Sequence, residues 1–225
     1  MAWLVATLGL GLGYWLWRAA GAARVADWGR PWLNRLEGVN RLFCRHYHRL
    51  PEVWLPLPDG GPAVLAANHV SGLDPLLLIA ASRRPLRFLI AREEYERPGL
   101  TWIFRAVGCI PVDRGRRPEQ ALRAALRALQ AGEVVAVFPH GRIHLDSDPP
   151  RALKPGVVWL ARQAGCPVVP ARIEGIRAQR HTLLAPLVRS QASVTPRPPV
   201  DCVSLGDDDC LERIARAIEG RDPGP

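Results

Sequence analysis

The stretch PAVLAANHVSGLDPLLLIAA, residues 62–81, decides the fold. Residues 62–67 are apolar and follow a pair of glycines, a pattern that predicts a short buried strand. Asp74 and Pro75 then open a predicted helix that runs to about residue 81, because proline is favoured in the first helical turn. A buried strand that leads directly into a helix is typical of an α/β protein.

The same alternation continues through the rest of the chain. Short apolar runs predict further strands at residues 86–91, 109–112, 134–138, 167–173 and 192–199. Segments with helical periodicity or helix start signals predict helices at residues 99–107, 118–131, 156–164 and 207–218. We therefore predict an α/β fold with a mixed central sheet flanked by helices.

The first 50 residues are predicted to form a membrane-associated helical segment. Residues 1–17 carry no charge, and aromatic residues lie near both ends of the run, as at membrane interfaces: Trp3, Tyr14, Trp15 and Trp17. Arginines from Arg18 onward would hold the following chain on the cytoplasmic side, and a signal peptide cleaved near Ala23 is the alternative. We predict a membrane anchor and amphipathic helix over residues 1–50, at the cell inner membrane, and a cytoplasm-facing domain over residues 51–225.

A second helix is predicted to begin near Pro31. Apolar residues recur along it at helical spacing: Trp32, Leu36, Val39 and Phe43. Polar residues fall on the opposite face: Asn34, Glu37, Arg41 and Arg45. Two interpretations stay open, since the apolar stripe can pack on the domain or lie in the membrane interface, and one helix can do both.

The charge of the chain favours anionic partners. Its 225 residues carry a formal net charge of +9, which suits phosphate head groups, a membrane surface or an acidic carrier protein. Lys154 is the single lysine, so a general preference for arginine offers a competing explanation for part of the charge. Basic and stacking aromatic residues form no stripe suited to nucleic acid, and we expect no nucleic-acid partner.

The five cysteines predict free thiols rather than a disulfide or zinc framework. They are odd in number, scattered and without a CxxC pair: Cys44, Cys109, Cys166, Cys202 and Cys210. His140 and His144 are spaced by four, but no carboxylate cluster accompanies them, so no metal site is expected.

His69 and Asp74 are the strongest candidates for chemistry. They lie five residues apart where the strand gives way to the helix, and a turn there can bring the two side chains into contact. Asp74 would then hold one imidazole nitrogen and leave the other to accept a proton. The structural alternative is that Asp74 caps the helix and His69 is an ordinary turn residue.

Two further strand ends carry candidate groups. Arg114 follows the strand at 109–112, where it can clamp a phosphate with Asp113 orienting it. The sequence FPHGR at residues 138–142 predicts a tight turn whose backbone N–H groups can face an anion or a developing oxyanion. A solvated ion pair and a plain sharp turn are the respective alternatives.

These blocks, in this order and spacing, resemble the glycerophospholipid acyltransferase family, which includes lysophosphatidic acid acyltransferases. The resemblance covers roughly residues 32–199. The family's NHxxxxD motif is matched by Asn68, His69 and Asp74. Its G-x-I-F/P-V-x-R strand end, FPEGTR turn and V-P strand are matched by Gly108, Ile110, Pro111, Val112, Arg114, Phe138, Pro139, Gly141, Arg142, Val169 and Pro170. The chain departs from the pattern where His140 replaces the glutamate and where the arginine is displaced to position 142.

The resemblance implies that residues 51–225 form an acyltransferase domain with a glycerol-3-phosphate acyltransferase-like fold. It implies direct transfer, in which His69 takes the proton from an acceptor hydroxyl as that hydroxyl attacks the thioester of acyl-CoA or an acyl carrier protein. Asp74 would stabilise the imidazolium, and backbone N–H groups near His69 or Gly141 would hold the oxyanion. No cofactor is expected beyond this co-substrate.

The substrate-binding candidates come from the same blocks, with Arg114 and Arg142 expected at the acceptor phosphate. They are Asn68, Ser71, Arg114, His140, Gly141, Arg142 and Lys154. We expect 1-acylglycerol-3-phosphate as the favoured acceptor, and we expect His140 to alter acceptor preference. The alternatives are an ornithine-lipid or glycolipid acceptor, or a non-catalytic lipid-binding relative.

Overall fold

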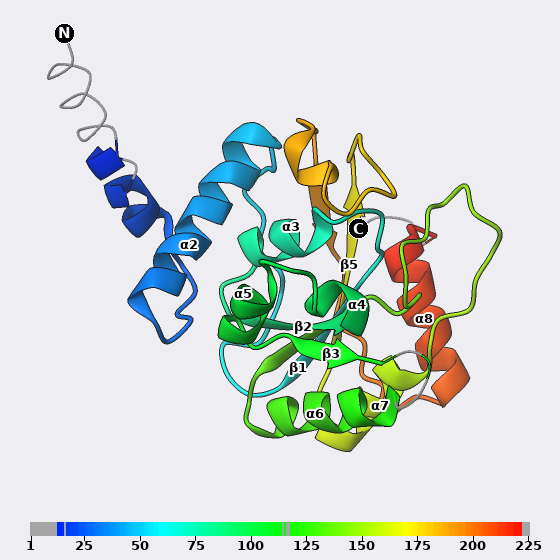
Figure 1. The fold of residues 1–225 in the computed structure, drawn as a ribbon. Helices are drawn as coiled ribbons and strands as arrows, with labels where there is room; N and C mark the ends of the chain where they lie inside the picture. Colours follow the sequence, from blue (N-terminus) through cyan, green and yellow to red (C-terminus); the bar gives the residue numbers. More distant parts are fainter. Residues whose placement is uncertain (1–12, 16, 114, 116–117, 222–225) are drawn as a thin grey trace, which may run out of the picture.

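The computed structural model describes residues 13–15, 17–113, 115 and 118–221, and within them a six-stranded sheet forms the centre of the molecule (Figure 1). The strand order is β3-β2-β4-β1-β5-β6, and all neighbours pair in parallel except β5 and β6. The strands are β1 (Ala63–Ala67), β2 (Leu86–Ala91), β3 (Ile110–Val112), β4 (Val134–Val137), β5 (Val168–Glu174) and β6 (Ser193–Pro196). The predicted mixed sheet is confirmed.

The apolar sequence of β1 explains its place inside the sheet. All five of its residues are buried, and alternate residues enter the two hydrophobic cores on opposite faces. Ala63, Leu65 and Ala67 face one core, and Val64 and Ala66 face the other. A strand covered on both faces needs a continuous apolar run instead of apolar and polar alternation, which is the pattern of residues 62–67.

Helices cover both faces of the sheet, as the sequence predicts. One core includes residues of α3 (Asp74–Ala80), with α5 (Thr101–Ala106) packed against it through a partly buried side chain. The other core includes residues of α6 (Pro118–Gln130), α7 (Gly156–Ala164) and α8 (Asp207–Glu219). Three short elements were not predicted: α4 (Arg92–Tyr95), the π-helix η1 (Phe43–Tyr47) and the 3-10 helix η2 (Ala185–Leu187). The predicted strands and helices of the domain are all present, with ends shifted by a few residues.

Helix α2 (Pro31–Leu42) packs on the domain through the face that the sequence marks as polar. Its buried residues include Glu37 and Arg41, whereas Trp32, Leu36 and Val39 of the apolar stripe are 38%, 42% and 50% exposed. Phe43, the last residue of the stripe, packs against the core. The interpretation that α2 packs on the domain is therefore confirmed, but the helix packs mainly through the opposite face and leaves most of the apolar stripe exposed.

The polar face of α2 can be buried because its groups find partners. Arg41 donates to the carbonyl oxygens of Ala80 and Ser82 and pairs with Glu37, whose other carboxylate oxygen accepts from the backbone N–H of Val25. A Cβ on Gly38 would lie 1.9 Å from the carbonyl oxygen of Ala20, so the glycine lets the preceding helical segment pack against α2.

The expected anchor at residues 1–17 lies mostly outside the described residues; residues 13–15 and 17 are helical. In the part of the chain that the structure describes, no helix has the length and apolar character needed to cross a membrane. The expectation of free thiols is wrong for Cys202 and Cys210, which form a disulfide because the loop before α8 brings their Cα atoms to 5.4 Å. Cys44, Cys109 and Cys166 are free and buried.

Candidate active site

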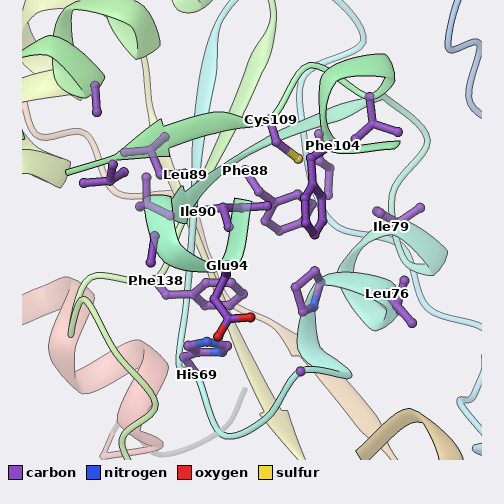
Figure 2. Close-up of a pocket in the computed structure, with 18 of the residues that line it drawn as sticks. His69, Leu76, Ile79, Phe88, Leu89, Ile90, Glu94, Phe104, Cys109 and Phe138 are labelled. Carbon is purple, nitrogen blue, oxygen red and sulfur yellow. The ribbon is translucent and has the colours of Figure 1, made fainter. Parts of the chain in front are cut away.

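The turn after β1 and the turn after β4 lie side by side at one edge of the sheet. Because β1 and β4 are adjacent and parallel, their carboxyl ends bring residues 68–74 next to residues 138–142. His69 and Phe138 are direct neighbours here, with ring centroids 4.1 Å apart and planes inclined by 16° (Figure 2). Phe88 of β2 stacks on the far side of this pair, 6.1 Å from the Phe138 ring.

His69 and Asp74 form the predicted pair. The Nδ1–H of His69 donates to Asp74 Oδ2 across 2.7 Å, and Asp74 is fully buried. The backbone N–H groups of Val70 and Ser71 donate to the same oxygen at 2.6 and 2.9 Å, and the Ser71 hydroxyl donates to Oδ1 at 2.8 Å. Four donors thus fix the carboxylate, which in turn fixes the imidazole tautomer and leaves Nε2 as a proton acceptor.

His69 lines a cavity of about 810 Å³, a volume suited to a small-molecule or lipid ligand. The lining is mainly apolar and comes from α3, β2, α5 and β4, as Figure 2 shows for Leu76, Ile79, Phe88, Leu89, Ile90, Phe104 and Phe138. Burial raises the pKa of the lining thiol of Cys109 to about 12, so it stays protonated and is no nucleophile. A hydrocarbon chain suits such a lining.

Lys154 brings a positive charge to the same cavity. Its side chain lies across Gly141, because a Cβ on Gly141 would come 2.5 Å from Lys154 Cε and 2.7 Å from Nζ. Gly141 also has φ +75°, which favours glycine. The backbone N–H of Lys154 donates to the Pro139 carbonyl, so residues 139–154 close as a loop around this point.

Glu94 is a cavity residue that the sequence did not single out. It lies on α4, directly after β2, and Figure 2 shows its carboxylate pointing toward His69 within the cavity that both residues line. It also pairs with Arg97 at 3.1 Å. The run of charges from Arg92 to Arg97 resembles a solvated surface, so the sequence gives no signal that one of them faces the cavity.

Asn68 and Ser71 hold the turn together in this structure. The Asn68 amide donates to the Ile173 carbonyl at 2.8 Å and accepts from the Ile173 N–H at 2.7 Å, which ties β1 to β5. Ser71 is fully buried, and its hydroxyl serves Asp74 and the backbone N–H of Leu73. Their polar groups therefore hold the turn that carries His69 and Asp74, and a substrate contact through either residue stays a prediction.

His140 lies on the other side of the loop from His69. It is 1% exposed, its ring stacks on His144 with centroids 4.4 Å apart, and its Nε2 lies 3.3 Å from a carboxylate oxygen of Glu219 on α8. These groups line a second cavity of about 630 Å³. Burial lowers the pKa of His140, opposed by its hydrogen bond with Glu219. His140 therefore faces the second cavity and is not among the described residues that line the His69 cavity.

Of the two arginines expected at the acceptor phosphate, the structure describes only Arg142. Arg142 is exposed at the turn after β4 and is not among the described residues that line the His69 cavity. Arg114 lies outside the described residues. Its neighbour Asp113 is described, accepts from the Gly115 N–H at 3.1 Å and approaches Arg92 at 3.8 Å.

Four of the backbone N–H groups near His69 and Gly141 donate to other acceptors in this structure, so an oxyanion contact from this region stays a prediction. The Gly141 N–H donates to the Phe138 carbonyl at 2.8 Å, and the Gly72 N–H donates to the His181 carbonyl at 3.2 Å. Val70 and Ser71 direct their N–H groups at Asp74. The sequence located the turns correctly, but which way their N–H groups point depends on tertiary contacts.

Comparison with known proteins places this geometry in a family. A sequence model of the Acyltransferase family matches residues 44–174. A probable 1-acyl-sn-glycerol-3-phosphate acyltransferase of Mycoplasma genitalium is 34% identical over 51% of this chain and 44% of its own length. The 1-acyl-sn-glycerol-3-phosphate acyltransferase of Bacillus subtilis is 26% identical over 53% of this chain and 59% of its own.

One further curated relative and one solved structure are similar to this chain. An N-acylphosphatidylethanolamine synthase of Arabidopsis thaliana is 33% identical over 50% of this chain and 43% of its own, so the chain spans about half the length of these curated relatives. The crystal structure of the 1-acyl-sn-glycerophosphate (LPA) acyltransferase PlsC from Thermotoga maritima shares the fold, with a TM-score of 0.63 at 20% identity over 97% of this chain and 92% of that one. The family match covers more than half of the sequence, and the chain belongs to the Acyltransferase family.

Proposed function

We propose that this protein transfers a fatty acyl group from a thioester onto the free hydroxyl of a lysophospholipid, with 1-acylglycerol-3-phosphate as the favoured acceptor. One observation carries the proposal: a buried Asp74 orients His69 at an apolar cavity that also holds the cation of Lys154. An oriented base, a lining suited to a hydrocarbon chain and a charge suited to a phosphate are the groups this reaction needs. The names of the Mycoplasma and Bacillus relatives support the same acceptor.

The chemical steps follow from the His69 geometry. Nε2 takes the proton of the acceptor hydroxyl while the hydroxyl oxygen forms a bond to the thioester carbonyl carbon. The tetrahedral intermediate then collapses, the C–S bond breaks, and the departing thiolate takes the proton from the imidazolium. Asp74 keeps the imidazole oriented in both steps, because the N–H groups of Val70 and Ser71 and the Ser71 hydroxyl hold its carboxylate in place. Acyl-CoA or an acyl carrier protein supplies the thioester.

The acceptor phosphate is assigned to Lys154, which lies beside Gly141 in the same cavity. Arg114 and Arg142 stay in the proposal as the arginines that the resemblance places at this phosphate. We expect Lys154→Gln to raise the Michaelis constant for 1-acylglycerol-3-phosphate roughly tenfold, because a charge-assisted hydrogen bond is lost. The constant for uncharged monoacylglycerol should stay unchanged. Arg213→Gln, which removes an exposed cation on α8, is the matched control.

The acceptor itself is tested by a panel. The Arabidopsis relative is named for a product acylated on an amine, so the assay should include phosphatidylethanolamine beside lysophosphatidic acid, a lyso-ornithine lipid and a lyso-glycolipid. Purified full-length protein with long-chain acyl-CoA or acyl carrier protein should acylate lysophosphatidic acid fastest. Faster acylation of another acceptor would replace the proposed substrate, and transfer to none of them would favour a non-catalytic lipid-binding protein.

The proposed site of action is a membrane surface, with the domain on the cytoplasmic side of the inner membrane. Helix α2 exposes Trp32, Leu36 and Val39, and Trp102 of α5 lies 5.8 Å from the Trp32 ring and is 62% exposed. An exposed apolar patch with tryptophans suits the interfacial region of a bilayer. The exposure of Trp32, Leu36 and Val39, on a helix that packs on the domain mainly through its other face, supports the membrane interpretation of α2.

A further inference from the structure

The loop between β5 and β6 exposes apolar side chains that packing does not explain. Leu183, Leu184 and Leu187 are 60%, 47% and 70% exposed, although they follow one another closely around η2. We call residues 180–189 the leucine loop. Grouped exposed leucines are unfavourable in water and commonly mark a contact surface.

The leucine loop is held against the catalytic turn. The Gly72 N–H donates to the His181 carbonyl at 3.2 Å, and the Arg180 N–H donates to the Val70 carbonyl at 2.8 Å. A Cβ on Gly72 would lie 1.9 Å from the Thr182 carbonyl oxygen, so the glycine permits this close approach. Thr182, Leu183 and Pro186 also line the His69 cavity, and the loop is therefore part of its rim.

The other side of the leucine loop is hydrogen-bonded to residues 47 and 48 at the end of η1, the π-helix that continues α2, and it lies beside this end of the helical segment in Figure 1. The Tyr47 hydroxyl donates to the Leu187 carbonyl at 2.7 Å, and the fully buried His48 lies with Nε2 3.1 Å from the Pro186 carbonyl. Burial lowers the pKa of His48, so the neutral ring donates this bond. The backbone is thus fixed from two directions while Leu184 and Leu187 project outward.

The charge around the leucine loop indicates what covers it. Residues 175–192 contain no acidic residue. Three arginines and one histidine accompany the leucines there: Arg177, Arg180, His181 and Arg189. Arg180 pairs with Asp148 of the neighbouring loop. Exposed leucines bordered by arginines suit a bilayer that carries anionic lipids, because apolar insertion and attraction to phosphate then act together.

We infer that the leucine loop inserts Leu184 and Leu187 into an anionic bilayer and so seats the rim of the His69 cavity on the membrane. This contact is separate from the exposed stripe of α2, and it lies at the cavity rim beside the catalytic turn. A lipid acceptor can then pass from the bilayer to His69 with its acyl chain shielded from water. The passage rests on the proposed function, whereas the insertion does not.

Insertion is tested with a fluorophore in the full-length protein. Leu187→Cys and Arg213→Cys are labelled with an environment-sensitive dye; Arg213 is exposed on α8, away from the leucine loop in sequence, and is the control. Cys44, Cys109 and Cys166 are buried, and the unsubstituted protein corrects for their labelling. In phosphatidylglycerol vesicles, the dye at 187 should shift to the blue and be quenched by nitroxide lipids, more than in pure phosphatidylcholine. No shift at 187, or an equal shift at 213, would overturn the inference.

Passage is tested by transfer rates. Leu184→Gln with Leu187→Gln should lower transfer to a long-chain acceptor in vesicles by roughly tenfold, because two leucines lose an apolar environment. Transfer to a short-chain, water-soluble acceptor should be unchanged, as should both rates in Val203→Gln. Equal losses on both acceptors would overturn the inference. So would sedimentation that shows the native protein to be a dimer and the variant a monomer, with no quenching at 187, because the leucines would then cover a second copy of the chain. If the native protein transfers nothing, the proposed function fails and the fluorophore still decides insertion.

Discussion

Phe138 lies flat against the imidazole of His69, and Phe88 stacks behind it. A ring held on one face by Phe138 and at Nδ1 by Asp74 has little freedom to turn. The face of an aromatic ring is also electronegative, so it favours the imidazolium that forms when His69 takes the proton.

Replacing Phe138 by leucine keeps an apolar wall and removes the stacked ring. We expect Phe138→Leu to lower kcat roughly tenfold with little change in KM, and Phe138→Tyr to restore most of it. Steady-state kinetics provide the measurement. Phe104→Leu is the control, because Phe104 lines the same cavity and stacks on Tyr95 instead. Equal effects of the two leucine substitutions would assign Phe138 to the cavity wall alone.

At the residue scale, the sequence predicted the contacts that depend on residues close together in the chain. His69 and Asp74 meet because five residues form a single turn, so their contact depends on few distant residues. Glu94 and His140 depend on how α4 and α8 pack against the site, and single-residue patterns carry no information about that packing. The same reason explains why Gly141 directs its N–H at Phe138.

At the scale of elements, the loop of residues 139–154 is joined to α8 by the contact between His140 and Glu219. His140→Glu would place a second carboxylate beside Glu219 in a buried position. We expect this variant to lose about 2 kcal/mol of unfolding free energy, and Glu219→Gln to restore stability in the double variant. Urea unfolding of all four proteins gives the coupling energy. Simple additivity would mean that the loop and α8 are independent here.

Two buried histidines predict how stability depends on pH. Burial lowers the pKa of both His48 and His140 below the ordinary value of 6.5, so the unfolded chain binds their protons first as the pH falls. The stability that the two neutral histidines contribute to the folded state is present above pH 6.5, and it is lost as the pH falls below this value. We expect the pH dependence of the unfolding free energy of His140→Asn to be shallower than that of the native protein between pH 6.5 and 5. The difference is at most about 1.4 kcal/mol per pH unit for one proton, and identical slopes would contradict it.

Helix α2 shows what periodicity predicts and what it misses. The spacing of Trp32, Leu36 and Val39 correctly predicted an apolar stripe, but the helix packs on the domain mainly through the opposite, polar face. Glu37 and Arg41 can be buried because backbone carbonyls of residues 80 and 82 and the N–H of Val25 complete their hydrogen bonds. Such partners come from distant segments, so hydropathy alone assigns this face to water.

At the scale of the whole molecule, the alternation of apolar runs and helical segments predicted the α/β sheet. The unit formed by β1 and α3 was the clearest, because its apolar run, its turn and its Asp-Pro start are all local. The strand order β3-β2-β4-β1-β5-β6 was not predicted, since it depends on pairing between distant strands. The disulfide between Cys202 and Cys210 was not predicted for a related reason, because it requires the loop before α8 to fold back on the helix.

The central claim is that His69 acts as the base for acyl transfer to a lysophospholipid. The most direct measurement is the rate of transfer from long-chain acyl-CoA or acyl carrier protein to 1-acylglycerol-3-phosphate by purified full-length protein in anionic vesicles. His69→Ala is compared with the native protein and with His46→Ala, which removes an exposed histidine of η1. We predict that His69→Ala loses about two to four orders of magnitude in rate at an unchanged melting temperature, while His46→Ala keeps native activity. Substantial transfer by folded His69→Ala would contradict the account.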